Sequence, residues 1–401
     1  MSADGGPPVG DGRPGPADVA CAAALVGLPG MTPVRLARLL DGRRPAAAWE
    51  VLLSGADPAA ADARWTSVAA ATDPVEVAAR YRTAGVEVII GDDDRYPERL
   101  RGDPGAPAVL LCRGDPGAAG VGPSVAVVGT RSATPYGEQV AAELGRDLAA
   151  AGVTVVSGLA LGIDAAAHAG ALAAGRGARP PVGVAGTGLD VPYPRTNARL
   201  WDGVARAGAV LSEAPLGSPP RRGAFPARNR IIAALSDVVV VVECHLGGGA
   251  LHTAEAAARR GIPVVAVPGS VRSPASRGTN GLLVDGCAPV RDVHDVLVAV
   301  SLARAGRDAP APALRARTFV AAAGRDVARA GRAAGTSGAE ACPVDDAAAR
   351  TVWAALGADP LTSAALAERT GLAIGDLARA CRQLLAAGAV VEGPGWWRRR
   401  W

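Results

Sequence analysis

The sequence predicts an α/β fold, in which a doubly wound parallel sheet lies between an N-terminal helical segment and a small C-terminal module. Short β-branched runs alternate with helical stretches from Val86 to about Val298. The strand candidates are apolar along their whole length, which is typical of strands covered on both faces. The chain has 401 residues, 49% of them hydrophobic, which is enough to fill the cores of two or three domains.

Six segments of this alternating region are predicted as strands and five as the helices that connect them. The strands are 124–129, 153–158, 181–186, 209–213, 237–243 and 263–269. The helices are 136–151, 163–174, 196–206, 226–235 and 250–260. Helical connections between buried strands predict a parallel sheet with helices on both faces. Ligands of such sheets bind at the carboxyl ends of the strands, so the residues after each strand are the candidates for a site.

The N-terminal part divides into a Gly/Pro-rich start and a helical segment. Residues 1–16 are predicted to be disordered, because they hold too few apolar residues to form a core. The stretch CAAALVGLPGMTPVRLARLL predicts two helices joined by a tight turn, with Thr32 as the N-cap ahead of Pro33. We expect a helical domain over 17–80, of the helix-hairpin-helix or SAM-like type. It either offers backbone N–H groups to a phosphate or is a purely structural domain in which Gly30 makes the turn.

The C-terminal part is predicted to be a linker followed by an independent domain. Residues 301–345 have weak periodicity and many Gly, Ala and Pro residues, so we expect a flexible linker. Three helical segments and the stretch VVEGPGWWRRR predict a winged helix-turn-helix over 346–401. Its recognition helix, 374–386, carries only Arg379 and Arg382 as basic readers, too few for sequence-specific reading of duplex DNA. A group of tryptophans and arginines suits either nucleic-acid or protein contacts; its members are Trp396, Trp397, Trp401, Arg398, Arg399 and Arg400.

Composition and charge exclude several classes of protein. All 42 basic residues are arginines, and the 38 acids leave a formal charge of only +4, so clustering of arginines matters more than net charge. The six cysteines form no CxxC pair, which argues against a zinc knuckle and a disulfide framework. The start of the chain has no signal-peptide pattern, and no apolar run is long enough to span a bilayer. We therefore expect a cytoplasmic protein with no membrane contact.

Residues after the first two predicted strands form the first part of a candidate site. Gly129, Thr130, Arg131 and Ser132 precede the next helix and are expected to present backbone N–H groups and a guanidinium to one anion. The spacing is not GxGxxG and no GxxxxGK occurs, so neither a dinucleotide nor an ATP site is supported. After the second strand, Asp164 is expected to cap the helix that contains His168, with direct ligand contact as the alternative.

The segment RRGAFPARNR, residues 221–230, forms the second part. It combines four arginines and no acid with one of the chain's two phenylalanines. Prolines upstream disfavour regular structure, so its first half is expected on a loop and its second half in the first turns of a helix. Cations at a helix N-terminus are opposed by the helix dipole unless an anion binds there. The expected contacts are Arg221, Arg222, Phe225, Arg228 and Arg230.

This composition predicts a clamp for single-stranded DNA. Guanidinium groups bind phosphate bidentately, and an exposed aromatic ring stacks on a nucleobase with about 1–3 kcal/mol per base. In the alternative interpretation, Phe225 belongs to the core and the arginines are solvated. The residue types alone leave both interpretations open.

Five stretches carry a resemblance to a known family. VAVVGTRSATPYG, VSGLALGIDAAAHAGAL, GTGLDVPYPRTN, SEAPLGSPPRRGAFPARNRIIAALSD and VPGSVRSPASRGTNGLLVDGCAPV, in this order and spacing, resemble the DNA processing protein A family, also called DprA or Smf, over about 86–300. The resemblance implies an extended Rossmann-like domain that binds single-stranded DNA in a basic pocket and forms homodimers. It also implies help in loading the recombinase RecA during natural transformation, with no catalytic residue and no cofactor. The implied pocket residues are Arg131, Arg222, Phe225 and Arg228, with the amides of Gly129 to Ser132 on a phosphate.

The sequence departs from the family pattern at two places. Leu161 stands where a basic residue is frequent, and GGGALHTA replaces the common GSLITA stretch. Cys244, His245 and His252 lie nearby without metal-site spacing, so no metal is expected.

An enzyme is the alternative class. The residues Gly247, Gly248, Gly249, Thr253 and Glu255 loosely echo the PGGxGTxxE motif of nucleotide-processing hydrolases, the lysine-decarboxylase-like (LOG) proteins. No nucleophile with a partnered base is apparent, and we expect a non-catalytic DNA binder. The sequence leaves open whether its process is transformation or general recombination and repair.

Overall fold

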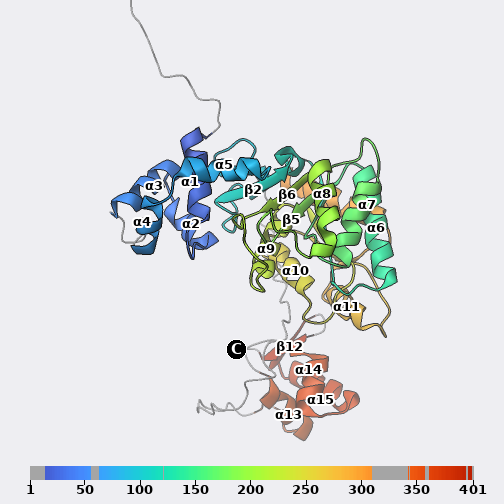
Figure 1. Cartoon of the computed structure of the whole chain (residues 1–401). Helices are drawn as coiled ribbons and strands as arrows, with labels where there is room; N and C mark the ends of the chain where they lie inside the picture. The colour runs from blue at the N-terminus through green and yellow to red at the C-terminus, as the bar shows by residue number, and fades with distance from the viewer. Residues whose placement is uncertain are drawn as a thin grey trace, which may run out of the picture. The chain divides into compact units, whose positions relative to one another are not determined.

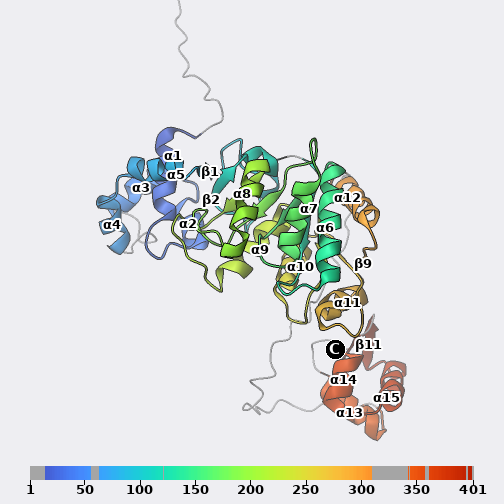
Figure 2. The ribbon, with the colours of Figure 1, turned by 45° about the vertical axis from the view of Figure 1, so that its right-hand side comes forward.

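The computed structural model describes residues 14–55, 63–120, 122–308, 342, 344–356, 361–393 and 396–399. These divide into two compact units, a larger one with the N-terminal helices and the sheet, and a smaller one with the C-terminal module (Figures 1 and 2). Over these ranges, no helix has both the length and the apolar character needed to cross a bilayer.

The larger unit is built on a nine-stranded sheet with the order β1-β2-β6-β5-β4-β3-β7-β8-β9. Neighbours from β6 through β9 are parallel, whereas β1 and β2 join the edge in antiparallel fashion. The strands are β1 (Glu87–Ile90), β2 (Val109–Gly114), β3 (Ser124–Val128), β4 (Thr154–Ser157), β5 (Val182–Val184), β6 (Ala209–Ser212), β7 (Val238–Val241), β8 (Val264–Ala266) and β9 (Ala288–Pro289). The predicted parallel sheet is confirmed, and β1, β2 and β9 extend it.

Helices cover both faces of this sheet. They are α6 (Pro135–Ala150), α7 (Ile163–Ala173), α8 (Ala198–Ala207), α9 (Ala224–Ala234), α10 (Gly249–Ala258), α11 (Arg277–Val284) and α12 (Val293–Asp308). Alternate residues of β3 pack on opposite sides, since Val125 and Val127 share a core with α6, α7 and α12. Ala126 and Val128 instead join the core beneath α9 and α10. Because β3 pairs with both β4 and β7, the winding direction reverses there, and a ligand crevice is expected at this point.

The N-terminal segment forms five helices, as the hairpin pattern predicted for the first two. They are α1 (Pro16–Val26), α2 (Pro33–Leu39), α3 (Pro45–Ser54), α4 (Ala63–Ala70) and α5 (Pro74–Thr83). The hydroxyl of Thr32 accepts a hydrogen bond from the amide of Arg35, which confirms the predicted N-cap. Gly30 lies in the turn at φ +69°, a conformation that favours glycine.

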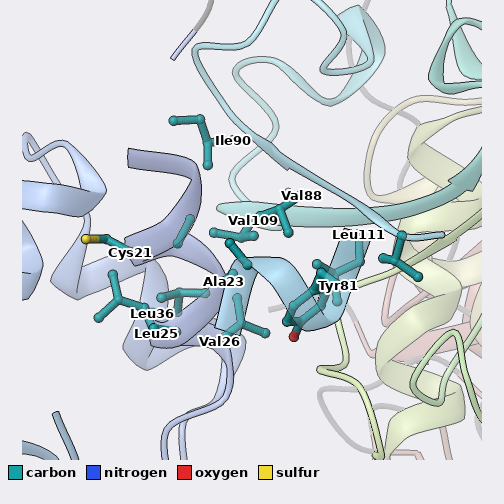
Figure 3. Close-up of a cluster of buried hydrophobic side chains, with 14 of the residues drawn as sticks. Cys21, Ala23, Leu25, Val26, Leu36, Tyr81, Val88, Ile90, Val109 and Leu111 are labelled. Atoms are coloured by element: carbon teal, nitrogen blue, oxygen red, sulfur yellow. The ribbon is translucent and has the colours of Figure 1, made fainter. Parts of the chain in front are cut away.

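The N-terminal helices share a hydrophobic core with the edge of the sheet. Figure 3 shows Leu25 and Val26 of α1 in one cluster with Val88 of β1 and Val109 of β2. These side chains belong to one buried cluster that also contains Tyr81 of α5. The helical segment and the α/β domain therefore belong to a single compact unit.

The C-terminal module has the predicted winged-helix order. Its helices and strands are α13 (Ala347–Ala355), α14 (Ser363–Thr370), α15 (Ile374–Ala386), β10 (Leu361–Thr362), β11 (Val390–Gly393) and β12 (Trp396–Arg399), with the strands paired in the order β10-β12-β11. The carboxylate of Asp346 caps α13 by accepting from the amide of Ala349 at 2.8 Å. Two members of the tryptophan and arginine group are structural. Trp397 is buried, and the guanidinium of Arg399 stacks on Trp353 at 4.1 Å.

Two predicted boundaries differ or fall outside the described residues. The linker was expected to begin at residue 301, but α12 continues to Asp308 because its apolar positions pack on the sheet. Most of the remaining linker, residues 309–341, and most of the segment expected to be disordered, residues 1–13, lie outside the described residues.

Candidate nucleic-acid interface

A pocket of about 600 Å³ opens at the carboxyl ends of β3, β4 and β7, where the winding of the sheet reverses. Its wall is made by the loops after these strands, by the loops after β5 and β6, and by the first turns of α9 and α10. Seven of the nine predicted contact residues line it: Gly129, Thr130, Arg131, Arg221, Arg222, Phe225 and Arg228. Ser132 and Arg230 are not part of the lining.

Three arginines give the pocket its positive charge. Arg131, Arg221 and Arg222 are all exposed, and in the described part of the chain none of them forms an ion pair. Arg131 follows β3, while the other two lie in the segment before α9. Because no carboxylate among the described residues forms an ion pair with them, their charge is available to an anionic ligand.

Phe225 is neither on a loop nor in the core. Since α9 begins at Ala224, two residues earlier than predicted, Phe225 lies in the first turn of this helix. Its ring is half-buried, and the Cζ atom of Arg131 lies 4.9 Å from the ring centroid. The ring of Tyr193 lies beside it, with the centroids 5.4 Å apart and the planes inclined by 36°.

Tyr193 is a pocket residue that the sequence reasoning did not single out. It lies on the loop between β5 and α8, and 39% of its surface is exposed. Its position within GTGLDVPYPRTN, after a strand of the predicted sheet, was the signal that placed it near the carboxyl edge. The pocket thus contains two aromatic rings where one was expected.

Arg228 forms part of the pocket wall through internal hydrogen bonds. Its guanidinium is buried and donates to the carbonyl of Gly158 at 2.8 Å and to the carbonyl of Val184. Burial lowers the pKa of Arg228 to about 10, while the nearby carboxylate of Asp164 opposes this effect. Arg228 therefore joins the ends of β4 and β5, and its charge lies at the base of the pocket.

Asp164 does not cap α7 as expected. This helix begins at Ile163, and the buried Asp164 carboxylate instead accepts from the amides of Gly158 at 3.1 Å and Ala160 at 3.4 Å. Burial raises its pKa, and Arg228 counteracts part of that rise. On the same helix, His168 is fully buried, and burial lowers its pKa to about 4.

Arg230 was expected in the pocket, but it forms an ion pair elsewhere. Its two terminal nitrogens donate to the carboxylate of Glu213 at 2.8 and 2.6 Å. Both side chains are largely buried, with 22% and 13% exposure. The negative carboxylate just after β6 compensates this cation, so the guanidinium is not directed to a ligand.

The expected phosphate cradle after β3 is partly closed by internal hydrogen bonds. The amide of Thr130 donates to the carbonyl of Glu243 at 2.7 Å, and the amide of Ser132 donates to the hydroxyl of Thr130. The Glu243 carboxylate itself occupies the start of α6, where it accepts from the amide and the hydroxyl of Thr134 at 2.9 and 2.6 Å. A buried side-chain anion therefore occupies the N-terminus of α6, next to the loop to which the sequence assigned a phosphate. The only sequence signal was an acid at the end of an apolar strand.

Part of the pocket wall is formed by three glycines at the start of α10. Gly247, Gly248 and Gly249 line it together with Thr253. Glu255 is not part of the lining and lies 3.7 Å from His252 and 3.9 Å from Arg259. Across the described ranges, no group of three His, Cys, Asp or Glu side chains is placed to hold a metal ion.

Two family models match the chain. The model described as DNA recombination-mediator protein A matches residues 87–301, and the model described as DprA winged helix domain matches residues 337–395. Together they cover the sheet with its pocket and most of the C-terminal module, up to residue 395.

Individual relatives agree with these matches. Protein Smf of Synechocystis sp. is 33% identical over 332 residues, 80% of this chain and 82% of the relative. A putative DNA processing protein DprA of Mycobacterium tuberculosis is 41% identical over 239 residues, 57% of this chain and 60% of the relative. The X-ray structure of DNA processing protein A from Streptococcus pneumoniae superposes with a TM-score of 0.61 at 31% identity, covering 71% of this chain and 98% of that one.

Proposed function

The chain belongs to the DNA recombination-mediator protein A family, and we propose that it is a non-catalytic mediator that binds single-stranded DNA in the pocket at the carboxyl edge of its sheet. The observation that carries this proposal is the grouping of Arg131, Arg221 and Arg222 around the rings of Phe225 and Tyr193. Guanidinium groups bind the phosphates of the strand, and aromatic rings stack on its bases.

The pocket favours a single strand over a duplex. In a duplex the bases are paired and stacked inside, so an aromatic side chain in a pocket does not reach their faces without unstacking them. A single strand presents both its phosphates and its base faces to the same pocket. The aromatic pair therefore supports single-stranded DNA, whereas the arginines alone would suit any nucleic acid.

We also propose that the protein acts as a homodimer and helps to load RecA on single-stranded DNA. Family membership supports both parts of this proposal. A cytoplasmic location agrees with such a role.

Binding measurements test the proposed function directly. In fluorescence anisotropy, an oligothymidylate should bind more tightly than a duplex of equal length, because only the single strand offers its bases. RecA filament formation on DNA covered by a competing single-strand binding protein should be faster in the presence of the protein. Equal affinity for both DNA forms, or no effect on RecA, would contradict the corresponding part of the proposal.

A hydrolase remains the alternative class, because the glycines before α10 and Thr253 do line the pocket. The position of Glu255 outside the lining weakens the likeness to PGGxGTxxE. Incubation with AMP distinguishes the classes: we expect no released adenine, and its release would show an enzyme.

A further inference from the structure

Contacts within the protein take up part of the ring surface of Phe225, which is half-buried. One face is covered by the guanidinium of Arg131, whose Cζ atom lies 4.9 Å from the centroid. The ring also lies against the backbone of Gly186, where an added Cβ atom would be only 3.1 Å from Cδ1. The neighbouring ring of Tyr193 lies on a further side. Phe225 is thus the more buried member of the aromatic pair, and contacts within the protein take up part of its ring.

Tyr193 is the more exposed member of the pair. It lines the pocket, is 39% exposed, and its ring centroid lies 5.4 Å from that of Phe225, within the range of an aromatic contact. A nucleobase approaching the exposed arginines therefore meets the surface of Tyr193 more readily than that of Phe225.

The loop that carries Tyr193 is anchored on both sides. The hydroxyl of Thr187 donates to the carbonyl of Val191 at 2.7 Å. The side-chain amide of Asn197 donates to the carbonyls of Leu159 and Ala160, at 3.1 Å each. The first bond closes a turn within the loop, and the Asn197 bonds tie its end to the segment after β4. A pre-positioned ring loses less conformational entropy on binding than one on a free loop.

We infer that Tyr193 is the principal base-stacking residue of the pocket and that Phe225 packs against its ring. This inference rests on the proposed function and adds a binding residue to it. The arginines hold phosphates by charge, and Tyr193 holds a base by contact with its face. The two contributions differ in their dependence on salt, because only the phosphate contacts release counterions.

The test compares four proteins on two ligands. The variants are Tyr193→Ala, Tyr193→Phe and Tyr136→Ala, measured with wild type by fluorescence anisotropy at fixed salt. Tyr136 is a matched control, since it is a 49% exposed tyrosine that does not line the DNA pocket. The ligands are an oligothymidylate and an abasic strand with the same number of phosphates. Thermal melting of each variant shows that it is folded.

We expect Tyr193→Ala to raise the Kd for oligothymidylate by about 5- to 150-fold, the range of one lost stacking contact. Tyr193→Phe keeps the ring and should bind like wild type, as should Tyr136→Ala. On the abasic strand Tyr193→Ala should match wild type, because no base is present to stack. The salt dependence of binding should be the same in all four proteins.

Two results would overturn the inference and one would overturn its premise. If Tyr193→Ala binds oligothymidylate like wild type, while Arg221→Ala combined with Arg222→Ala binds weakly, the stacking role is wrong and the DNA site stands. Equal weakening of Tyr193→Ala on both ligands would show a structural role. If the arginine double variant also binds like wild type, the proposed function itself fails.

Discussion

Arg228 and Arg230 lie two residues apart on α9, yet their guanidinium groups are held by opposite parts of the domain. Arg228 donates to the carbonyl of Gly158 at the base of the pocket, whereas Arg230 forms two hydrogen bonds with Glu213. A spacing of two residues places side chains on different faces of a helix. The cluster of four arginines in the sequence therefore divides into two ligand-accessible residues and two that hold the fold.

The ion pair of Arg230 predicts a loss of stability without a loss of DNA binding. Arg230→Ala leaves the largely buried Glu213 carboxylate without its partner, which should lower the free energy of unfolding by about 1–3 kcal/mol. Urea unfolding measures this change. Affinity for oligothymidylate, measured below the unfolding transition, should equal that of wild type. A folded Arg230→Ala protein with much weaker DNA binding would show that Arg230 contributes to the DNA site.

The carboxylate of Glu243 predicts a second structural effect. Glu243→Gln replaces an acceptor at the start of α6 with an amide whose NH₂ group cannot accept from Thr134, and should cost about 1–3 kcal/mol of stability. Thr134→Ser retains the hydroxyl and serves as the control, with stability near that of wild type. Unfolding in urea measures both variants. A Glu243→Gln protein as stable as wild type would show that this carboxylate does not hold the loop after β3.

Buried His168 predicts a loss of stability at mildly acidic pH. Its pKa is about 4 in the folded protein, below the ordinary value of 6.5, because burial disfavours the charged form. Between these two values the unfolded chain binds a proton that the folded chain does not, so stability falls as the pH drops from about 6.5 towards 4. From pH 7.5 to pH 5 this group should remove about 2 kcal/mol.

The variant His168→Phe isolates this contribution. Phenylalanine is similar in shape and does not ionise, so the stability of the variant should fall by about 2 kcal/mol less than that of wild type between pH 7.5 and pH 5. His294→Phe removes an exposed imidazole, with 84% side-chain exposure, and serves as the matched substitution at a surface histidine. Identical pH dependence in wild type and His168→Phe would contradict the assignment.

The strands and the location of the site were predictable because they depend on local pattern. Continuous apolar runs such as VVVV of β7 predict buried parallel strands, and the rule for carboxyl ends then selects Arg131 and the segment before α9. The family resemblance supported the predicted ligand, single-stranded DNA. These inferences do not depend on which side chains contact each other in the folded protein.

The partners of individual side chains were not predictable, because they are set by tertiary contacts. Arg230 of α9 forms an ion pair with Glu213, which follows β6. Because α9 begins two residues earlier than expected, Phe225 lies in a helix and not on a loop. Glu243 occupies a helix N-terminus that follows a different strand. Tyr193 lines the pocket because of the path of the loop between β5 and α8, and residue types alone do not predict that path.

The central claim is that Arg221 and Arg222 bind DNA phosphates at the carboxyl edge of the sheet. The direct measurement is the salt dependence of oligothymidylate binding by the double variant Arg221→Ala/Arg222→Ala. Its control is Arg176→Ala/Arg206→Ala, which removes the same charge from exposed residues just before β5 and β6, at the opposite edge of the sheet. The claim predicts weaker binding and a log–log slope reduced by about 1.4 in the first variant, about 0.7 for each lost phosphate contact, and little change in slope in the control. Equal slopes and affinities in the two double variants would contradict it.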